Sequence, residues 1–338
     1  LYHQSQLENG VSKMWTVGDW LQPYSTREDS RRGETDHGLI STAFYARSLD
    51  IVARTAKVLQ RTDDAKHYAS LFEEAKANFQ AAFFDQQGNI KQGQSTQTSY
   101  LLAIGFDLLS DDILQAAEAN LMEQFEIAGR HLRTGFLGTP LIAPVLEKIG
   151  QQDFALELLF KESYPSWLFP VSQGATTMWE RWDGYTHDKG YVKKAGSLNH
   201  YAYGAIGQWM YDRLAGITPL SAGYKEVRIS PVVTTHLSHA GATYQSPHGE
   251  IKSYWFLNQD ELRMEIKIPP NVTATVEVPS VVYIKNTAGT TSDTQKLNGL
   301  ITINGSALDV HSKNKVHINK NLKFSAGHYV IRVSRNNE

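Results

Sequence analysis

The segment Trp179-Glu-Arg-Trp-Asp183 places a glutamate between two indoles and adds an arginine and a second carboxylate. Tryptophan rings bind the apolar face of a pyranose, and a carboxylate held against apolar walls can keep or take a proton near neutral pH. The combination suits sugar chemistry. Glu180 is therefore the first candidate for a catalytic residue.

Four other short motifs combine aromatic and polar residues in the segments expected to link helices. They are Gly18-Asp-Trp20, Arg133-Thr-Gly-Phe-Leu-Gly138, Tyr164-Pro-Ser-Trp167 and Asn199-His-Tyr201. A ring of helical pairs would bring these linking segments together at one end of the ring. We therefore expect a pocket with aromatic walls, at least two carboxylates and a histidine.

Helical spacing of apolar residues covers roughly the first two thirds of the chain and β-type patterns cover the rest, with the change near Pro219. Repeated helical hairpins imply a bundle or toroid, and several short strands without helices imply a sandwich. The expected helices are 39–60, 63–84, 97–109, 111–127, 140–149, 153–161 and 199–214. The expected strands include 224–229, 250–256, 261–268, 273–278 and 328–333.

Composition bounds the class of protein. The chain has 338 residues, 41% hydrophobic and 20% charged, which suits two domains, and its net charge of -2 argues against a nucleic-acid partner. The absence of cysteine excludes disulfides and cysteine nucleophiles and leaves the compartment open. No apolar run approaches the roughly 20 residues of a membrane span. The first residue is leucine, and we expect the chain to begin inside a longer protein.

Six motifs follow one another along the chain, and they begin at Gly18, Gln97, Thr134, Tyr164, Gly174 and Asn199. This order resembles the bacterial α-L-rhamnosidases of glycoside hydrolase family 78 from about Val17 to Ile217. The segments 249–255 and 268–271 resemble that family's C-terminal β-domain. The resemblance implies part of an (α/α)6 six-hairpin barrel in residues 1–217 and an antiparallel β-sandwich in residues 218–338.

The resemblance further implies hydrolysis of terminal α-L-rhamnose with inversion, from a glycoside, oligosaccharide or polysaccharide and without a metal or other cofactor. Glu180 would be the general base that activates water. An inverting enzyme also needs a general acid roughly 6.5–9.5 Å away. The family carries that acid in a cysteine-containing motif that this chain lacks. We therefore expect the acid before Leu1 and doubt activity of the chain alone, since general acids contribute about 10²–10⁴-fold in rate.

Asp19, His200, Trp20 and Trp179 are the main expected substrate contacts, and each has a structural alternative. Asp19 binds a sugar hydroxyl or caps the following segment. His200 binds a hydroxyl, orients the base, or is a satisfied core histidine. Trp20 and Trp179 are the expected aromatic walls, against the sugar ring or its C5 methyl group, although large aromatic residues usually belong to the core.

Further candidates flank these residues. Trp182 is another possible aromatic wall with the same core alternative, and His131 either lies at the pocket rim or belongs to a loop. Arg181 and Asp183 form a surface pair, or Asp183 helps to position water. The charged stretch 27–36 is expected to be a solvated loop near the pocket entrance.

Two other functions stay open. An (α/α)6 barrel can act on a different sugar, because fold does not fix substrate. The chain could instead be a non-catalytic carbohydrate-binding fragment. Signature motifs of zinc proteases, α/β-hydrolases, nucleotide-binding and dinucleotide-binding proteins are absent. Neither the aglycone nor the oligomeric state follows from the sequence.

Overall fold

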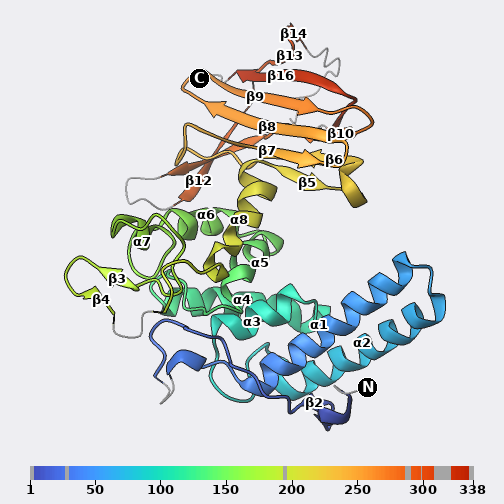
Figure 1. Cartoon of the computed structure of the whole chain (residues 1–338), viewed down its shortest axis with the longest axis vertical. Coiled ribbons are helices and arrows are strands. Elements are labelled where there is room, and N and C mark those ends of the chain that lie inside the picture. The colour runs from blue at the N-terminus through green and yellow to red at the C-terminus, as the bar shows by residue number, and fades with distance from the viewer. Residues whose placement is uncertain are drawn as a thin grey trace. The chain divides into compact units, whose positions relative to one another are not determined.

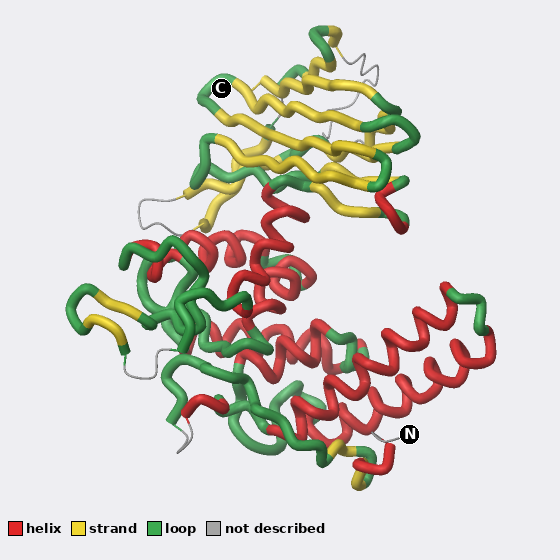
Figure 2. Tube along the Cα trace, viewed as in Figure 1, coloured by secondary structure: helices red, strands yellow, loops and turns green. Residues whose placement is uncertain are grey.

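The computed structural model describes residues 4–26, 30–192, 196–285, 291–297, 299–307 and 321–334. The chain divides into two compact units, Leu1–Ala205 and Ile206–Glu338. Helices and loops build most of the first unit, and strands build most of the second (Figure 1, Figure 2). The domain boundary between residues 217 and 218 remains a prediction.

Paired helices form the frame of the first unit. The helices α1 (His37–Val58) and α2 (Thr62–Phe83) lie side by side as a hairpin (Figure 1). They are followed by α3 (Gln97–Gly105), α4 (Asp111–Ile127), α5 (Ile142–Lys148), α6 (Gln152–Phe160) and α7 (Leu168–Ser172). The expected helical pairs are confirmed, with ends that differ by a few residues.

Polar side chains fix where two of these helices begin. The Asp36 carboxylate caps α1 by accepting a hydrogen bond from Leu39 N at 2.8 Å. Thr96 and Ser99 form a reciprocal capping box at the start of α3. Asp36 ends the charged stretch 27–36, in which residues 27–29 lie outside the described residues and Ser30–Arg32 form a 3-10 turn.

The helix expected over residues 199–214 is wrong in its extent. Residues 199–201 remain a loop, because His200 N donates to Met178 O at 2.8 Å and so joins two loop segments. A 3-10 turn then covers Ala202–Ala205, at the end of the first unit. The second unit begins with α8 (Ile206–Trp209) and a π-helical turn, Met210–Leu214.

The loops of the helical unit carry short hairpins and converge on one side (Figure 2). The hairpins are β1 (Leu7–Glu8) with β2 (Val11–Ser12) and β3 (Tyr185–Thr186) with β4 (Gly190–Tyr191). Backbone contacts tie distant loops together, since Phe136 N donates to Trp20 O at 3.0 Å. The Tyr203 hydroxyl also donates to Leu21 O at 3.3 Å. The helices thus act as a frame that presents these loops.

Two sheets enclose the core of the second unit. The larger has the order β14 (Ser306–Ala307), β13 (Ile301–Ile303), β16 (Gly327–Ser334), β9 (Glu261–Ile268), β8 (Gly249–Leu257), β7 (His239–Ser246). The smaller has the order β15 (Asn321–Phe324), β10 (Thr273–Glu277), β6 (Glu226–Ile229), β5 (Ile217–Pro219). A separate ribbon pairs β11 (Val281–Lys285) with β12 (Thr291–Lys296).

Alternating burial explains why these sheets pack against a common core. In β9 every second side chain is buried, as expected for strands with one face on the core. Trp255 is fully buried, and its indole donates to Leu214 O at 2.7 Å. The sandwich is antiparallel except for β6 and β10, which pair in parallel. Among the described residues, no helix has the length and apolar character that a membrane span requires.

Candidate active site

The Asp19 carboxylate accepts four hydrogen bonds from distant segments of the helical unit. Its Oδ2 accepts hydrogen bonds from Thr98 Oγ1 at 2.5 Å and Gly135 N at 2.7 Å. Its Oδ1 accepts from Leu137 N at 2.8 Å and Gly138 N at 3.2 Å. Burial raises the pKa of Asp19, while the same four hydrogen bonds oppose that rise. One carboxylate therefore joins the 18–20 motif to α3 and to the motif that begins at Thr134, here called the 134–139 motif.

Two glycines make this close approach possible. A Cβ atom on Gly135 would lie 2.4 Å from Asp19 O and 2.3 Å from Trp20 O. A Cβ atom on Gly138 would lie 2.2 Å from Thr98 Oγ1. The spacing of the two glycines in the 134–139 motif thus has a steric cause, because any side chain at either position would push the loop away from Asp19.

The expected role of Asp19 as a ligand of substrate hydroxyls is therefore corrected. Its exposed fraction is 0%, and protein donors occupy both carboxylate oxygens. No face of the group is left for a sugar. Asp19 instead orders the loops that carry Trp20 and Phe136.

Glu180 lies in a loop that pairs with residues 196–200. Its backbone N–H donates to Ser197 O at 2.9 Å, and its Oε2 accepts a hydrogen bond from Ser197 N at 2.7 Å. Gly196 has φ +72°, and a Cβ atom there would lie 2.0 Å from Glu180 Oε2. The carboxylate is partly exposed and held by the backbone of a neighbouring loop. Sequence reasoning missed Gly196 and Ser197, although a glycine three residues before the 199–201 motif was a visible signal of a tight turn.

His200 lies in a continuous run of stacked rings. Its imidazole packs on Phe136 at 4.9 Å and stacks on Tyr201 at 5.4 Å, measured between ring centroids. Its Nδ1 accepts a hydrogen bond from Ala202 N at 3.2 Å. The ring is partly exposed, so His200 is not a core histidine.

The three tryptophans expected at the site differ in how far they are exposed. Trp20 is partly exposed, and the Arg31 guanidinium lies 5.3 Å from its ring centroid. Trp179 is 6% exposed and packs edge-on against Tyr185. With so little of its ring exposed, the structure does not favour the expected role of Trp179 as a substrate wall. Trp182 is 2% exposed and stacks on Tyr203 with 3.8 Å between centroids.

His131 belongs to the loop after α4. Its Nδ1 lies 2.8 Å from Gly129 O, and its Nε2 lies 2.7 Å from Ser163 Oγ. Both ring nitrogens are thus engaged by the protein. His131 lines neither of the two cavities described below, and its place at the pocket rim stays a prediction.

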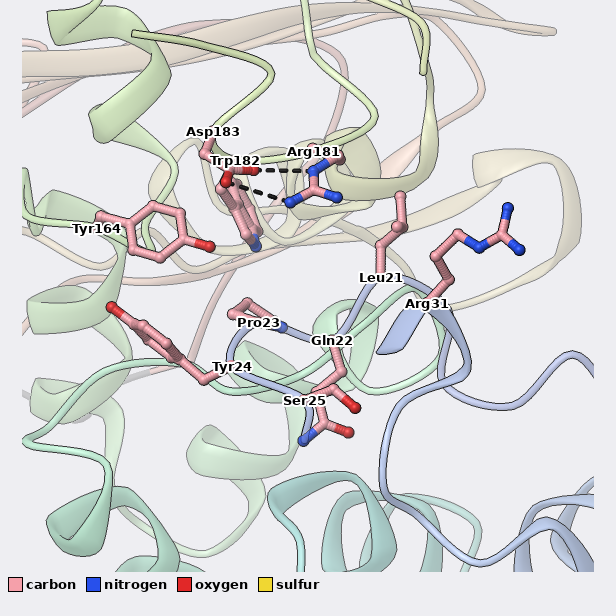
Figure 3. A pocket seen from close by; sticks show the side chains of 10 residues that line it. All are labelled: Leu21, Gln22, Pro23, Tyr24, Ser25, Arg31, Tyr164, Arg181, Trp182 and Asp183. Carbon is pink, nitrogen blue, oxygen red and sulfur yellow. Dashed lines mark hydrogen bonds and ion pairs between the residues drawn. The ribbon is translucent and has the colours of Figure 1, made fainter. Parts of the chain in front are cut away.

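A polar cavity of about 180 Å³ lies between the loop after Trp20 and the loop after Glu180 (Figure 3). Arg181 and Asp183 form one wall, with Arg181 Nε and Nη2 donating to the two carboxylate oxygens at 2.9 and 3.2 Å. The hydrogen bonds to Asp183 raise the pKa of Arg181 further. The full lining is Leu21, Gln22, Pro23, Tyr24, Ser25, Arg31, Tyr164, Arg181, Trp182 and Asp183.

An apolar hollow of about 430 Å³ lies between residues 17–20, 136–140 and 201–205. Trp20, Phe136 and Tyr201 contribute its aromatic side chains, and Tyr201 is 86% exposed. Phe136 and Tyr201 both contact His200, so this hollow brings together Trp20 and the His200 cluster. Within the described part of the chain, no three histidine, aspartate or glutamate side chains are grouped in a way that could hold a metal ion.

Comparison with known proteins assigns both units of the chain. The bacterial alpha-L-rhamnosidase six-hairpin glycosidase domain matches residues 2–214, and the corresponding C-terminal domain matches residues 216–291. An alpha-L-rhamnosidase of Formosa agariphila is 46% identical over 280 residues, which are 82% of this chain and 30% of that protein. One from Streptomyces avermitilis is 39% identical over 264 residues, 78% of this chain and 24% of the relative.

Solved structures lead to the same family. The Streptomyces avermitilis alpha-L-rhamnosidase complexed with L-rhamnose aligns with TM-score 0.80 and 32% identity, over 98% of this chain and 29% of that one. An Aspergillus terreus enzyme aligns with TM-score 0.75 and 28% identity, over 86% of this chain and 33% of that one. The chain thus spans about a third or less of the proteins that it matches. It belongs to the bacterial alpha-L-rhamnosidase family of six-hairpin glycosidases.

Proposed function

We propose that the chain contributes to the hydrolysis of terminal α-L-rhamnosides with inversion, and that Glu180 is the general base. The observation that supports this proposal is the position of the Glu180 carboxylate. Only its Oε2 accepts a hydrogen bond among the described residues, from Ser197 N at 2.7 Å. Among the described residues no donor contacts Oε1. This oxygen is the one that we assign to taking a proton from the attacking water.

We propose the following reaction, with Glu180 as the base. Water attacks the anomeric carbon from the face opposite the glycosidic oxygen, and Glu180 takes its proton as the new carbon–oxygen bond forms. A carboxylic acid on the other face gives its proton to the leaving oxygen, at roughly 6.5–9.5 Å from the base. We propose that this acid comes from a segment outside these 338 residues, since the matched relatives are much longer.

Two further residues are assigned to the sugar. His200 is held between Phe136 and Tyr201 and is partly exposed, which suits a hydrogen bond to a hydroxyl group. Trp20 lines the apolar hollow, where its ring can pack against the apolar face or the C5 methyl group of L-rhamnose. We propose a rhamnose-containing glycoside, oligosaccharide or polysaccharide as the substrate, and the name alpha-L-rhamnosidase of the relatives supports the rhamnose part of this proposal.

The test is hydrolysis of p-nitrophenyl α-L-rhamnoside, measured for the chain alone and joined to the preceding segment of its gene. Glu180→Gln should keep the fold and lower the rate by about 10²–10⁴-fold, because an amide cannot take the proton. Glu162→Gln alters an exposed glutamate in the same unit and should leave the rate unchanged. Wild-type turnover in Glu180→Gln would contradict the assignment.

Product stereochemistry tests the face of attack. In Glu180→Gly, azide should restore part of the lost rate by replacing the activated water. Inversion predicts a β-L-rhamnosyl azide from the α-linked substrate. An α-linked azide product would exclude a base on the face opposite the leaving group.

A further inference from the structure

The polar cavity between residues 21–25 and 181–183 contains buried donors that the protein leaves unsatisfied. The Trp182 side chain is 2% exposed, and its Nε1 has no hydrogen-bond acceptor within the described part of the chain. The Ser25 Oγ is likewise buried without a partner among those residues. Both residues line the cavity. A buried polar group without a partner costs about 1–3 kcal/mol, so the cavity favours a guest with hydrogen-bonding atoms.

The Trp182 ring is fixed in this orientation. It stacks on Tyr203 at an interplanar angle of 14° and meets Trp167 edge-on at 5.8 Å. Figure 3 shows the indole nitrogen directed toward the space above Pro23, below the Arg181–Asp183 pair. The N–H group cannot turn to another partner without breaking this stack. It is therefore a preorganised donor.

The charges of the cavity wall favour a neutral guest. Asp183 neutralises Arg181 through two hydrogen bonds, and the Arg31 guanidinium lies over the Trp20 ring. Burial, followed by the nearby Asp183 carboxylate, raises the pKa of Tyr164, so its phenol stays protonated and able to donate. The Arg181–Asp183 part of the wall thus offers donors and acceptors without a net charge, and the Arg31 guanidinium lies against the Trp20 ring. Sugar hydroxyl groups, which both donate and accept, match this wall.

The size of the cavity limits the guest to one small molecule. A volume of about 180 Å³ lies below the roughly 300 Å³ of the smaller ligand pockets in proteins. That space suits a single sugar ring. Tyr24 and Tyr164, whose rings meet edge-on at 5.5 Å, supply apolar surface for the ring carbons.

We propose that this cavity is a second sugar-binding site, which takes one neutral pyranose unit through hydrogen bonds from Trp182 and Ser25. The site goes beyond the proposed hydrolysis, because neither Glu180 nor His200 lines it. It stands independently of whether Glu180 is the base.

The indole N–H resonance of Trp182 tests the proposal directly. In the chain with 15N-labelled tryptophan, Trp182→Phe identifies this resonance by its loss while keeping an aromatic ring in the stack. Addition of L-rhamnose, and separately of D-xylose, should move the Trp182 resonance in a saturable way for at least one sugar. D-glucuronate, which has similar size and a carboxylate, should bind more weakly than the neutral sugars.

Matched variants separate binding from structural effects. Ser25→Ala should weaken the affinity seen at the Trp182 resonance by about five- to tenfold, the value of one hydrogen bond. Ser48→Ala, at an exposed serine on α1, should not change it. Glu180→Gln should retain the shift, which distinguishes this site from the proposed catalytic one. An unmoved Trp182 resonance with both neutral sugars, tighter binding of D-glucuronate, or full affinity in Ser25→Ala would overturn the proposal.

Discussion

Replacing Asp19 by asparagine tests whether this residue is an anchor or a ligand of the sugar. The amide nitrogen must take the place of one carboxylate oxygen. At Oδ1 it would face the N–H groups of both Leu137 and Gly138. At Oδ2 it would face Gly135 N–H and the Thr98 hydroxyl, and a hydroxyl can rotate to accept. The second orientation is therefore the less costly one.

The cost can be worked out for that orientation. One backbone N–H, that of Gly135, stays buried without an acceptor, which costs about 1–3 kcal/mol. The bonds at Oδ1 also lose the strengthening that an ionised acceptor gives. We expect a total loss of about 2–4 kcal/mol. For a unit of this size, that corresponds to a fall in Tm of about 5–15 °C.

Thermal unfolding followed by circular dichroism and tryptophan fluorescence measures this loss. Asp63→Asn changes an exposed aspartate of α2 and should stay within about 0.5 kcal/mol of the original protein. Thr98→Val should cost about 1 kcal/mol and should be non-additive with Asp19→Asn, because the two side chains share a hydrogen bond. An Asp19→Asn protein with unchanged Tm and weakened sugar binding would refute the anchor and restore the ligand.

Three further changes give measurable results. Glu157 is 2% exposed and pairs with Arg130 Nη2 at 2.6 Å, so Glu157→Gln should lower the free energy of unfolding by about 2–3 kcal/mol. The exposed control Glu74→Gln should leave it unchanged. Equal Tm values for the two variants would exclude a stabilising pair. Gly196→Ala should lower hydrolysis more than tenfold by displacing the Glu180 carboxylate, and Gly190→Ala, with a similar φ but open space, should not. Burial lowers the pKa of His236. Its contribution to stability is therefore present above its unfolded pKa of about 6.5 and is lost as the pH falls through the lower folded pKa. Urea unfolding should show that His236→Gln loses less unfolding free energy than the original protein when the pH is lowered.

The order of elements and the catalytic motif could be predicted because their signals are local. Helical periodicity and the cluster around Glu180 need only neighbouring residues in the sequence. Burial of a polar residue is different, since it depends on what other segments contribute. Asp19 looked like a substrate ligand because its four donors come from residues 79 to 119 positions away.

Packing around the tryptophans was hidden for the same reason. Trp179 and Trp182 carry the same side chain three positions apart, and both turned out to be almost fully buried. The orientation of the unsatisfied indole N–H of Trp182 depends on the stack with Tyr203, and no local sequence pattern predicts that contact. The role of Gly196 likewise depends on a contact with Glu180 across a loop.

The Asp19 anchor has a consequence for the order of folding. Its hydrogen bonds join positions separated by α1 to α4, so all four can exist only after the intervening chain has become compact. Closing such long loops costs conformational entropy before any bond forms. We therefore expect the helical frame to assemble first and the loops that carry Trp20 and Phe136 to reach their final positions late. A folding intermediate that lacks these hydrogen bonds would contain native helices, but its site loops would not yet be ordered.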